Sequence, residues 1–204
     1  MAEGDTDVNI CSQALLLLGA NTISSFTDGT APASVCSSIY PRIKSQTLGM
    51  YPWSFTLSKK SLSQSSESPA NFWTYAYTLP TDMFTGVPRR VYASNSSSAP
   101  TITGYEIQGD KLLTNQTTIV VDYQILVSET DMPSYFVQLL IYQIAWHLAE
   151  PITDQTSKSD YWKGIALGLP SENMRGGYFR QAMNIDGAGQ TNNVISDYIL
   201  TEVR

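Results

Sequence analysis

Residues 134–150 read SYFVQLLIYQIAWHLAE, and the rest of the chain is interpreted around this stretch. Apolar residues cover nearly every side of a helix drawn through it, while Gln143, His147 and Glu150 form its polar stripe. Ser134 can cap its start. A helix over residues 134–150 is about 25 Å long. The range is shorter than the roughly 20 residues that a bilayer span needs. The stretch therefore predicts a helix buried by several neighbours, and no membrane anchor.

Two further helices are predicted upstream. The first begins at Asp5 or Thr6, either of which can cap it, and ends at Leu18, with Gly19 as its C-terminal stop. The second covers residues 32–50, where Pro41 is expected to kink the helix or to split it in two. We expect these two helices to lie antiparallel.

A fourth helix is predicted downstream, beginning near Asp154, disturbed at residues 168–170 and resuming over residues 171–183. Residues 187–193 have the composition of a flexible linker. Beyond them lies an apolar segment, residues 194–204, which has little reason to follow such a linker unless it docks on another surface. We predict that this segment is a protein-interaction tail, and its candidate contact residues are Val194, Ile195, Tyr198, Ile199, Leu200 and Arg204.

Between residues 51 and 132 the hydrophobic period changes from that of helices to that of strands. Gly109-Asp110 has the composition of a two-residue hairpin turn. Alternation is clearest over residues 118–128, where Ile119, Val121 and Tyr123 share one face with Ile125 and Val127. Strands are predicted over residues 54–60, 72–79, 86–93, 105–108, 111–114 and 118–128.

Together these patterns predict an α+β fold that is mainly α. Residues 1–50 and 133–186 are expected to form an antiparallel four-helix bundle. Residues 51–132 are expected to form an inserted antiparallel β module that projects from one end of the bundle. Residues 187–204 would then be a linker and an extended docking tail.

The composition favours an interaction protein over an enzyme. Lys and Arg number 12 against 18 Asp and Glu, which gives a net charge of −6. Binding nucleic acid by counterion release needs clustered cations, so this balance argues against it. One His and two Cys exclude a multi-His metal site and a disulfide scaffold. The acidic N-terminus does not resemble a signal peptide, so we expect synthesis in a cytoplasm-like compartment.

The residues that could carry chemistry have plainer explanations. Cys11 or Cys36 could pair with His147, but both cysteines fall on apolar helix faces, where a free thiol acts as a small hydrophobe. The carboxylates of Glu106, Asp110 and Asp122 could serve a glycosidase, although such residues are common in β modules. Trp73, Tyr75 and Tyr77 could stack on sugars or bases, or pack on a helix. We therefore predict no catalytic residue, no cofactor and no metal site.

Several short sequence motifs, occurring in a fixed order, give the chain a resemblance to a known family. It resembles the head-to-tail adaptor proteins of short-tailed bacteriophages, often called tail tubular protein A, from about residue 10 to residue 186. The motifs are ALLLLG at residues 14–19, ISSF at 23–26, CSSIYPR at 36–42, YPWSF at 51–55, YTLPTD at 77–82, YEIQGDKLLT at 105–114 and VDY at 121–123, followed by the helix pair after Met132-Pro133.

The resemblance implies a structural virion protein of the neck and tail, made in the host cytoplasm and without catalysis. About twelve copies would form a ring beneath the phage portal protein and extend the DNA channel to the tail nozzle protein. The DNA would pass without specific binding, which suits an acidic channel wall. The C-terminal tail would reach the portal or an adjacent subunit.

Two other functions stay open. One is a carbohydrate-binding or cell-wall-degrading module of a phage tail, which would use the aromatic strand around Trp73 and the carboxylates of Glu106 and Asp122. The other is a scaffolding or chaperone protein that is absent from the finished particle.

Overall fold

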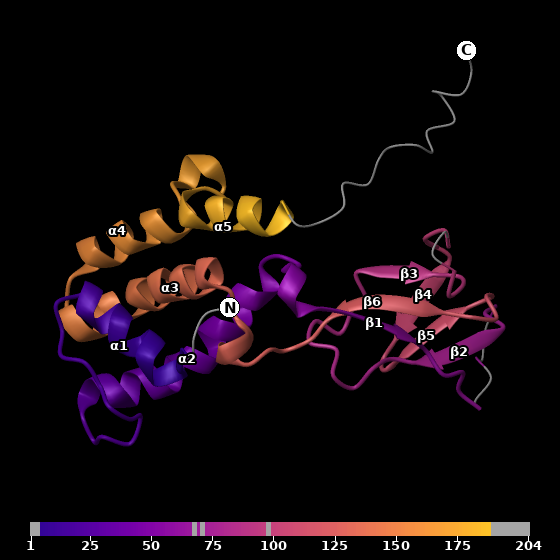
Figure 1. Ribbon diagram of the computed structural model, residues 1–204, viewed down its shortest axis with the longest axis horizontal. Helices are drawn as coiled ribbons and strands as arrows, with labels where there is room; N and C mark the ends of the chain where they lie inside the picture. The colour runs from indigo at the N-terminus through magenta and orange to yellow at the C-terminus, as the bar shows by residue number, and fades with distance from the viewer. Residues whose placement is uncertain (1–4, 67–68, 70–71, 97–98, 189–204) are drawn as a thin grey trace, which may run out of the picture.

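The structure is a computed structural model that describes residues 5–66, 69, 72–96 and 99–188. Helices occupy one end of the molecule and strands the other (Figure 1). The α-helices are α1 (Asp7–Leu17), α2 (Ala31–Gly49), α3 (Ser134–Thr153), α4 (Thr156–Leu167) and α5 (Gly177–Gly187), and the short 3₁₀ helices are η1 (Ser54–Thr56), η2 (Glu129–Asp131) and η3 (Pro170–Glu172). The strands are β1 (Leu57–Ser61), β2 (Tyr75–Thr78), β3 (Arg90–Tyr92), β4 (Tyr105–Gln108), β5 (Lys111–Thr114) and β6 (Val120–Gln124).

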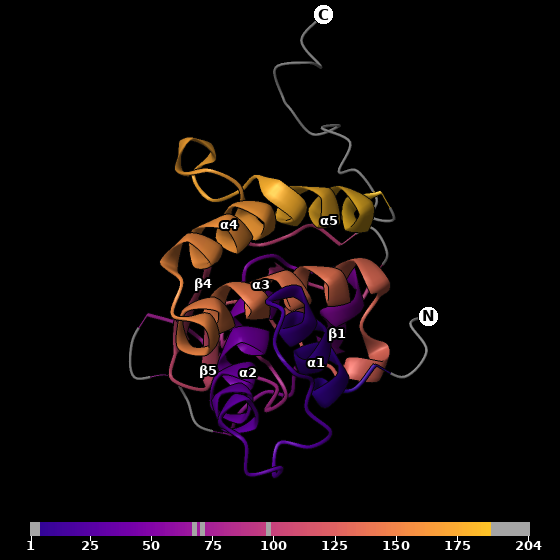
Figure 2. The ribbon, with the colours of Figure 1, turned by 90° about the vertical axis from the view of Figure 1, so that its left-hand side faces the viewer.

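The central helix is α3. It packs against α1, α2, α4 and α5, and Figure 2 shows α4 and α5 on one side of it and α1 and α2 on the other. Its fully buried residues include Leu139, Leu140 and Ile144. The predicted helix with several covering neighbours is therefore confirmed. Within the described ranges, no helix combines the length and the apolar character that a membrane span requires.

The predicted antiparallel four-helix bundle is wrong. The described residues form five α-helices, arranged around α3, in an α+β mix with two sheets. The predicted fourth helix is divided because Gly168, with φ of 82°, ends α4, and Gly177, with φ of 54°, begins α5. A Cβ on Gly177 would lie 2.6 Å from the backbone N of Gly168 and from the carbonyl O of Ile165. Only glycine allows this approach, and it turns α5 back over α3.

Local signals determine the ends of the first two helices. The hydroxyl of Thr6 accepts a hydrogen bond from the Asn9 N–H and caps α1. Gly19, with φ of 76°, follows the end of this helix, as predicted. Helix α2 is continuous across Pro41 and is not split in two. Pro41 lies on the exposed side of α2, so water can satisfy the carbonyl that lacks its usual partner.

The strands form two three-stranded sheets with the orders β1-β6-β3 and β2-β5-β4. Every pairing in them is antiparallel, as predicted. Strands β4 and β5 meet at Gly109, whose φ of 63° suits the predicted hairpin turn. Side chains from both sheets, including Tyr77, Leu112, Val121 and Tyr123, pack in one cluster that is separate from the helical core. The two sheets therefore enclose a second, smaller core.

Candidate functional site

The predicted docking tail lies outside the described residues. Its six candidate contact residues, Val194, Ile195, Tyr198, Ile199, Leu200 and Arg204, follow the last described residue, Ala188. The described surface that adjoins this segment is the C-terminal end of α5. The candidate site is therefore built from α5 and from the contacts that hold α5 in place.

Helix α5 buries one narrow stripe. Phe179, Ala182 and Asp186, spaced by three and four residues, are at most 3% exposed. Phe179 packs edge-on against Trp53, with 6.1 Å between the ring centroids. Two apolar residues and one buried carboxylate thus decide which side of α5 faces the protein and which side faces solvent.

Asp186 anchors the last turn of α5. Its carboxylate accepts hydrogen bonds from the Ser54 N–H at 3.0 Å, the Ser54 hydroxyl at 2.7 Å and the Tyr135 hydroxyl at 2.6 Å. Ser54 begins η1, and Tyr135 lies in the first turn of α3. Burial and the neighbouring Asp186 carboxylate both raise the pKa of Tyr135, so this hydroxyl stays a donor. One carboxylate therefore joins three segments that are far apart in the chain.

Trp53 forms the centre of the same region. It is fully buried, and its indole Nε1–H donates to the Thr47 carbonyl at 3.1 Å. Its ring lies 5.0 Å from the ring of Tyr51 and 5.1 Å from that of Phe136. Edge-on aromatic packing of this kind holds each ring in one orientation. The link from α2 into the sheets is consequently part of the helical core.

The buried amide of Gln124 joins the end of β6 to the end of α2. Its Nε2 lies 3.1 Å from both the Tyr51 carbonyl and the Thr56 hydroxyl. The Leu48 carbonyl is a weaker third acceptor at 3.4 Å. Because the side chain is only 7% exposed, its loss would leave carbonyls without a partner at the place where helices and sheets meet.

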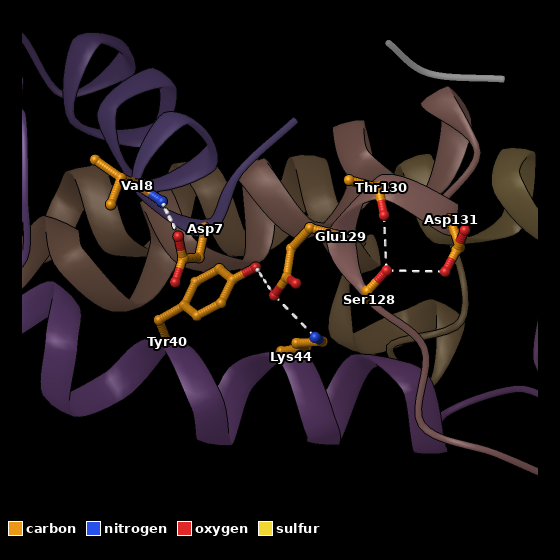
Figure 3. A network of polar contacts seen from close by, with 8 residues as sticks. All are labelled: Asp7, Val8, Tyr40, Lys44, Ser128, Glu129, Thr130 and Asp131. Atoms are coloured by element: carbon orange, nitrogen blue, oxygen red, sulfur yellow. Dashed lines mark hydrogen bonds and ion pairs between the residues drawn. The ribbon is translucent and has the colours of Figure 1, made fainter. Parts of the chain in front are cut away.

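A second polar link joins α2 to η2, on the connection from the sheets into α3. Figure 3 shows Tyr40 and Lys44 of α2 reaching the same carboxylate of Glu129, at 2.9 and 2.8 Å. Burial alone would raise the pKa of Glu129, but hydrogen bonds from Lys44 and Tyr40 outweigh it and lower the pKa below its usual value. Together with Gln124, this ion pair fixes the orientation of the sheets relative to the helices.

The opposite side of α5 carries an open groove of about 640 Å³, which we call the α5 groove. Ile185 is its main apolar side chain and is 46% exposed. Arg180 is the one charged residue in the part of the lining that the structure describes. Among the described residues, the lining consists of Gly177, Arg180, Gln181, Asn184, Ile185 and Ala188. The groove ends where the predicted linker begins.

Other large apolar side chains are exposed on both parts of the molecule. Leu16 at the end of α1 is 61% exposed, and Leu169 after α4 is 62% exposed. In the β part, Phe72 is 75% exposed. The remaining examples are Leu17, Val87, Leu126 and Tyr161. Apolar contact surface is thus available at the helical end and at the sheet end of the chain.

The structure brings the two cysteines together but does not make them reactive. Cys11 and Cys36 are both fully buried. A hydrogen bond between the thiols and burial raise the pKa of Cys11, while the same hydrogen bond lowers that of Cys36. Burial and the Arg42 charge lower the pKa of His147, whose ring stacks on Trp146. Lacking exposure, both thiols are packing residues, as the sequence indicates.

The predicted carboxylates of the β part lie on different sheets. Glu106 in β4 accepts a hydrogen bond from the Trp73 indole at 2.9 Å. Asp122 in β6 accepts one from the Tyr92 hydroxyl at 2.9 Å and lies 3.3 Å from the Lys59 ammonium. Asp110 lies in the turn of the β4–β5 hairpin. Across the described ranges, no group of three or more His, Cys, Asp or Glu residues is arranged to hold a metal ion.

Sequence reasoning assigned no role to the residues that hold α5. Asp186 contacts Ser54 across 132 positions of the chain. In the sequence, helical periodicity shows Asp186 only as a polar residue on an otherwise apolar stripe of α5. This position is the one sequence feature that points to its burial. Its partners become visible only when the distant segments lie side by side.

No family model matches the chain, and no curated protein matches it.

Proposed function

We propose that this chain is a structural virion protein, a head-to-tail adaptor that forms a ring of about twelve copies between the portal and the tail nozzle of a bacteriophage. The observation that carries the proposal is the two-part build. A helical core and a separate sheet core are joined by the buried amide of Gln124 and by the contacts of Glu129 with Tyr40 and Lys44. A subunit that contacts one partner at each end needs this rigid joint, because the partners are then held at a constant spacing.

The exposed apolar side chains agree with a subunit that works in an assembly. Leu16 and Leu169 on the helical part, and Phe72 on the sheet part, each exceed 60% exposure. In the proposed ring, identical copies would cover these side chains, and the portal template would set the rotation that closes the ring.

The charges suit a wall past which DNA slides. The chain has a net charge of −6, and several of its 12 cations are held by intramolecular contacts. Lys44 and Lys59 pair with carboxylates, and Lys158 donates to the Leu18 carbonyl at 3.1 Å. Cations engaged in this way contribute little to phosphate binding, which depends on free Lys and Arg.

The test is the mass of the complex formed with the portal ring encoded beside this gene. About twelve copies of the 22.5-kDa chain would add about 270 kDa. No added mass, with both proteins folded, would refute the adaptor function. Detection of the chain in mature virions distinguishes an adaptor from a scaffolding or chaperone protein, since the latter leaves the particle.

A matched pair of variants tests the tail. Ile199→Asp with Leu200→Asp replaces two apolar residues of the predicted contact set, and we expect it to abolish ring addition without unfolding the chain. Ser196→Asp with Thr201→Asp adds the same charge at polar positions of the same segment and should preserve ring addition. Equal behaviour of the two pairs would contradict the role of the tail.

A carbohydrate-binding or cell-wall-degrading module is the second candidate, and one observation favours it. Phe72 packs edge-on against Trp73 at 4.8 Å, and Trp73 in turn donates to Glu106. An aromatic pair beside a carboxylate, with Phe72 exposed and Trp73 half-buried, suits a sugar ring and its hydroxyls. Release of fragments from purified peptidoglycan, abolished by Glu106→Gln or Asp122→Asn, would favour this function over the adaptor.

A further inference from the structure

The lining of the α5 groove has the spacing of a helix seam. Gly177, Gln181, Asn184 and Ala188 follow one another by four, three and four residues, and Ile185 lies beside them. Small residues at both ends of the groove let another backbone approach closely, while Ile185 exposes apolar surface in between. A groove of this form fits one short helix lying along α5.

The sequence after Ala188 contains a segment with complementary chemistry. Val194, Ile195, Tyr198 and Ile199 would lie on one side of a helix, since they recur at i, i+1, i+4 and i+5. Glu202 would follow on the same side, and the described lining of the groove includes a cation, Arg180. A helix this short gains its stability from packing an apolar face against another surface.

The connection is long enough for the segment to return to its own groove. From Ala188 to Val194 the extended chain spans at most about 20 Å, and the groove follows α5 for about 16 Å between Gly177 and Ala188. In an antiparallel pair joined by this linker, Ile195 would lie over Ile185, and Glu202 would lie near Arg180. A short flexible linker also gives the segment an effective concentration of the order of millimolar, which favours its own chain over a second copy.

We propose that residues 194–202 bind as a helix in the α5 groove of their own chain while the protein is free. The groove would then be covered before assembly, and the tail would become available only when it leaves α5. This proposal concerns the free protein and does not depend on a portal partner.

Hydrogen exchange on the full-length chain tests the proposal without any partner. We expect amides of residues 194–202 to exchange slowly and at the same rate at two widely separated protein concentrations. Ile185→Asp should accelerate this exchange about tenfold or more by placing a charge in the groove. Leu169→Asp is the matched control, because Leu169 is 62% exposed and lies outside the groove. In the Leu169→Asp variant, the amides of residues 194–202 should exchange at the same rate as in the wild type.

Because Ile185 adjoins Asp186, Ala188→Asp serves as a second groove variant, and circular dichroism verifies that each variant is folded. Rapid exchange in the wild type would overturn the proposal, as would slow exchange that survives both groove variants. Protection that grows with protein concentration would also overturn it, because the occupant would then be a second copy. The mass of the portal complex is measured separately, so the adaptor function can fail while this proposal holds, and the reverse.

Discussion

The buried carboxylate of Asp186 offers the sharpest test of how α5 is held against η1 and α3. Asp186→Asn keeps the volume of the side chain but replaces one acceptor oxygen with an NH₂ donor. That donor would face the hydrogens of Ser54 and Tyr135, which now donate over 2.6 to 3.0 Å. The substitution therefore removes at least one hydrogen bond to a charged group and places donors against one another.

The expected cost follows from the number and setting of these bonds. A hydrogen bond to a charged group contributes about 1.5–3 kcal/mol. Ser54 is exposed, so water can satisfy its donors in the variant, whereas Tyr135 is half-buried. We therefore expect Asp186→Asn to lower the free energy of unfolding by about 2 kcal/mol. With a urea slope of about 2 kcal/mol/M, the midpoint should fall by about 1 M.

Urea denaturation followed by circular dichroism measures this change. Asp160→Asn, at an exposed position of α4, is the matched control and should alter stability by less than about 0.5 kcal/mol. Tyr135→Phe removes one donor and should cost about 1 kcal/mol. If Tyr135 and Asp186 act as one unit, the double variant should cost less than the sum of the two single variants. A loss below about 0.5 kcal/mol for Asp186→Asn would refute the anchoring role.

Three further predictions concern stability. Gly177→Ala should destabilise the chain by about 2 kcal/mol or more, because φ is 54° and the new Cβ would lie 2.6 Å from backbone atoms. Gly164→Ala, where a Cβ on α4 meets open space, is the control and should leave stability unchanged or raise it; thermal melting measures both. Burial and the Arg42 charge lower the pKa of His147 in the folded protein. As the pH falls, His147 is therefore protonated first in the unfolded chain. Stability should therefore decline from about pH 6.5 downward until the folded-state pKa is passed, and His147→Gln should flatten this decline in urea midpoints measured against pH. Glu129→Gln should cost about 1–2 kcal/mol at pH 7. Because the pKa of Glu129 is lowered in the folded state, its stabilisation is complete above the unfolded pKa of about 4.5 and disappears as the pH falls through the folded value, so wild type and variant should converge in strong acid.

Helices and turns with strong local signals were predictable from sequence. The hydroxyl cap at Thr6, the stop at Gly19 and the hairpin turn at Gly109 each depend on atoms within a few residues of one another. The burial of α3 on nearly all sides was predictable as well, because a helix without a solvated face must be covered. Periodicity also identified the inward face of β6, where Val121 and Tyr123 join the sheet core together with Ile119, which directly precedes the strand.

The helical architecture was not predictable in the same way. A pattern of apolar residues indicates that a segment needs covering, but it does not say which segment provides the cover. The interruption at Gly168 was visible in the sequence, yet the backbone contact between Gly168 and Gly177 that turns α5 back depends on a path through space. The four-helix bundle failed for this reason: it assumed that the two pieces of the fourth helix continue along one line.

By itself the sequence determined the identity of most elements, the antiparallel pairing of the strands and the absence of a helix fit to span a bilayer in the described ranges. These properties follow from interactions between residues that are close in the chain, or from the period of apolar residues. Only the tertiary structure decided that Asp186 meets Ser54 and Tyr135, that Glu129 meets Lys44, and that α5 leaves an open groove. The physical reason is that a buried hydrogen bond between distant residues leaves no periodic trace in either partner, so the pair is recognised only when folding has brought both to one place.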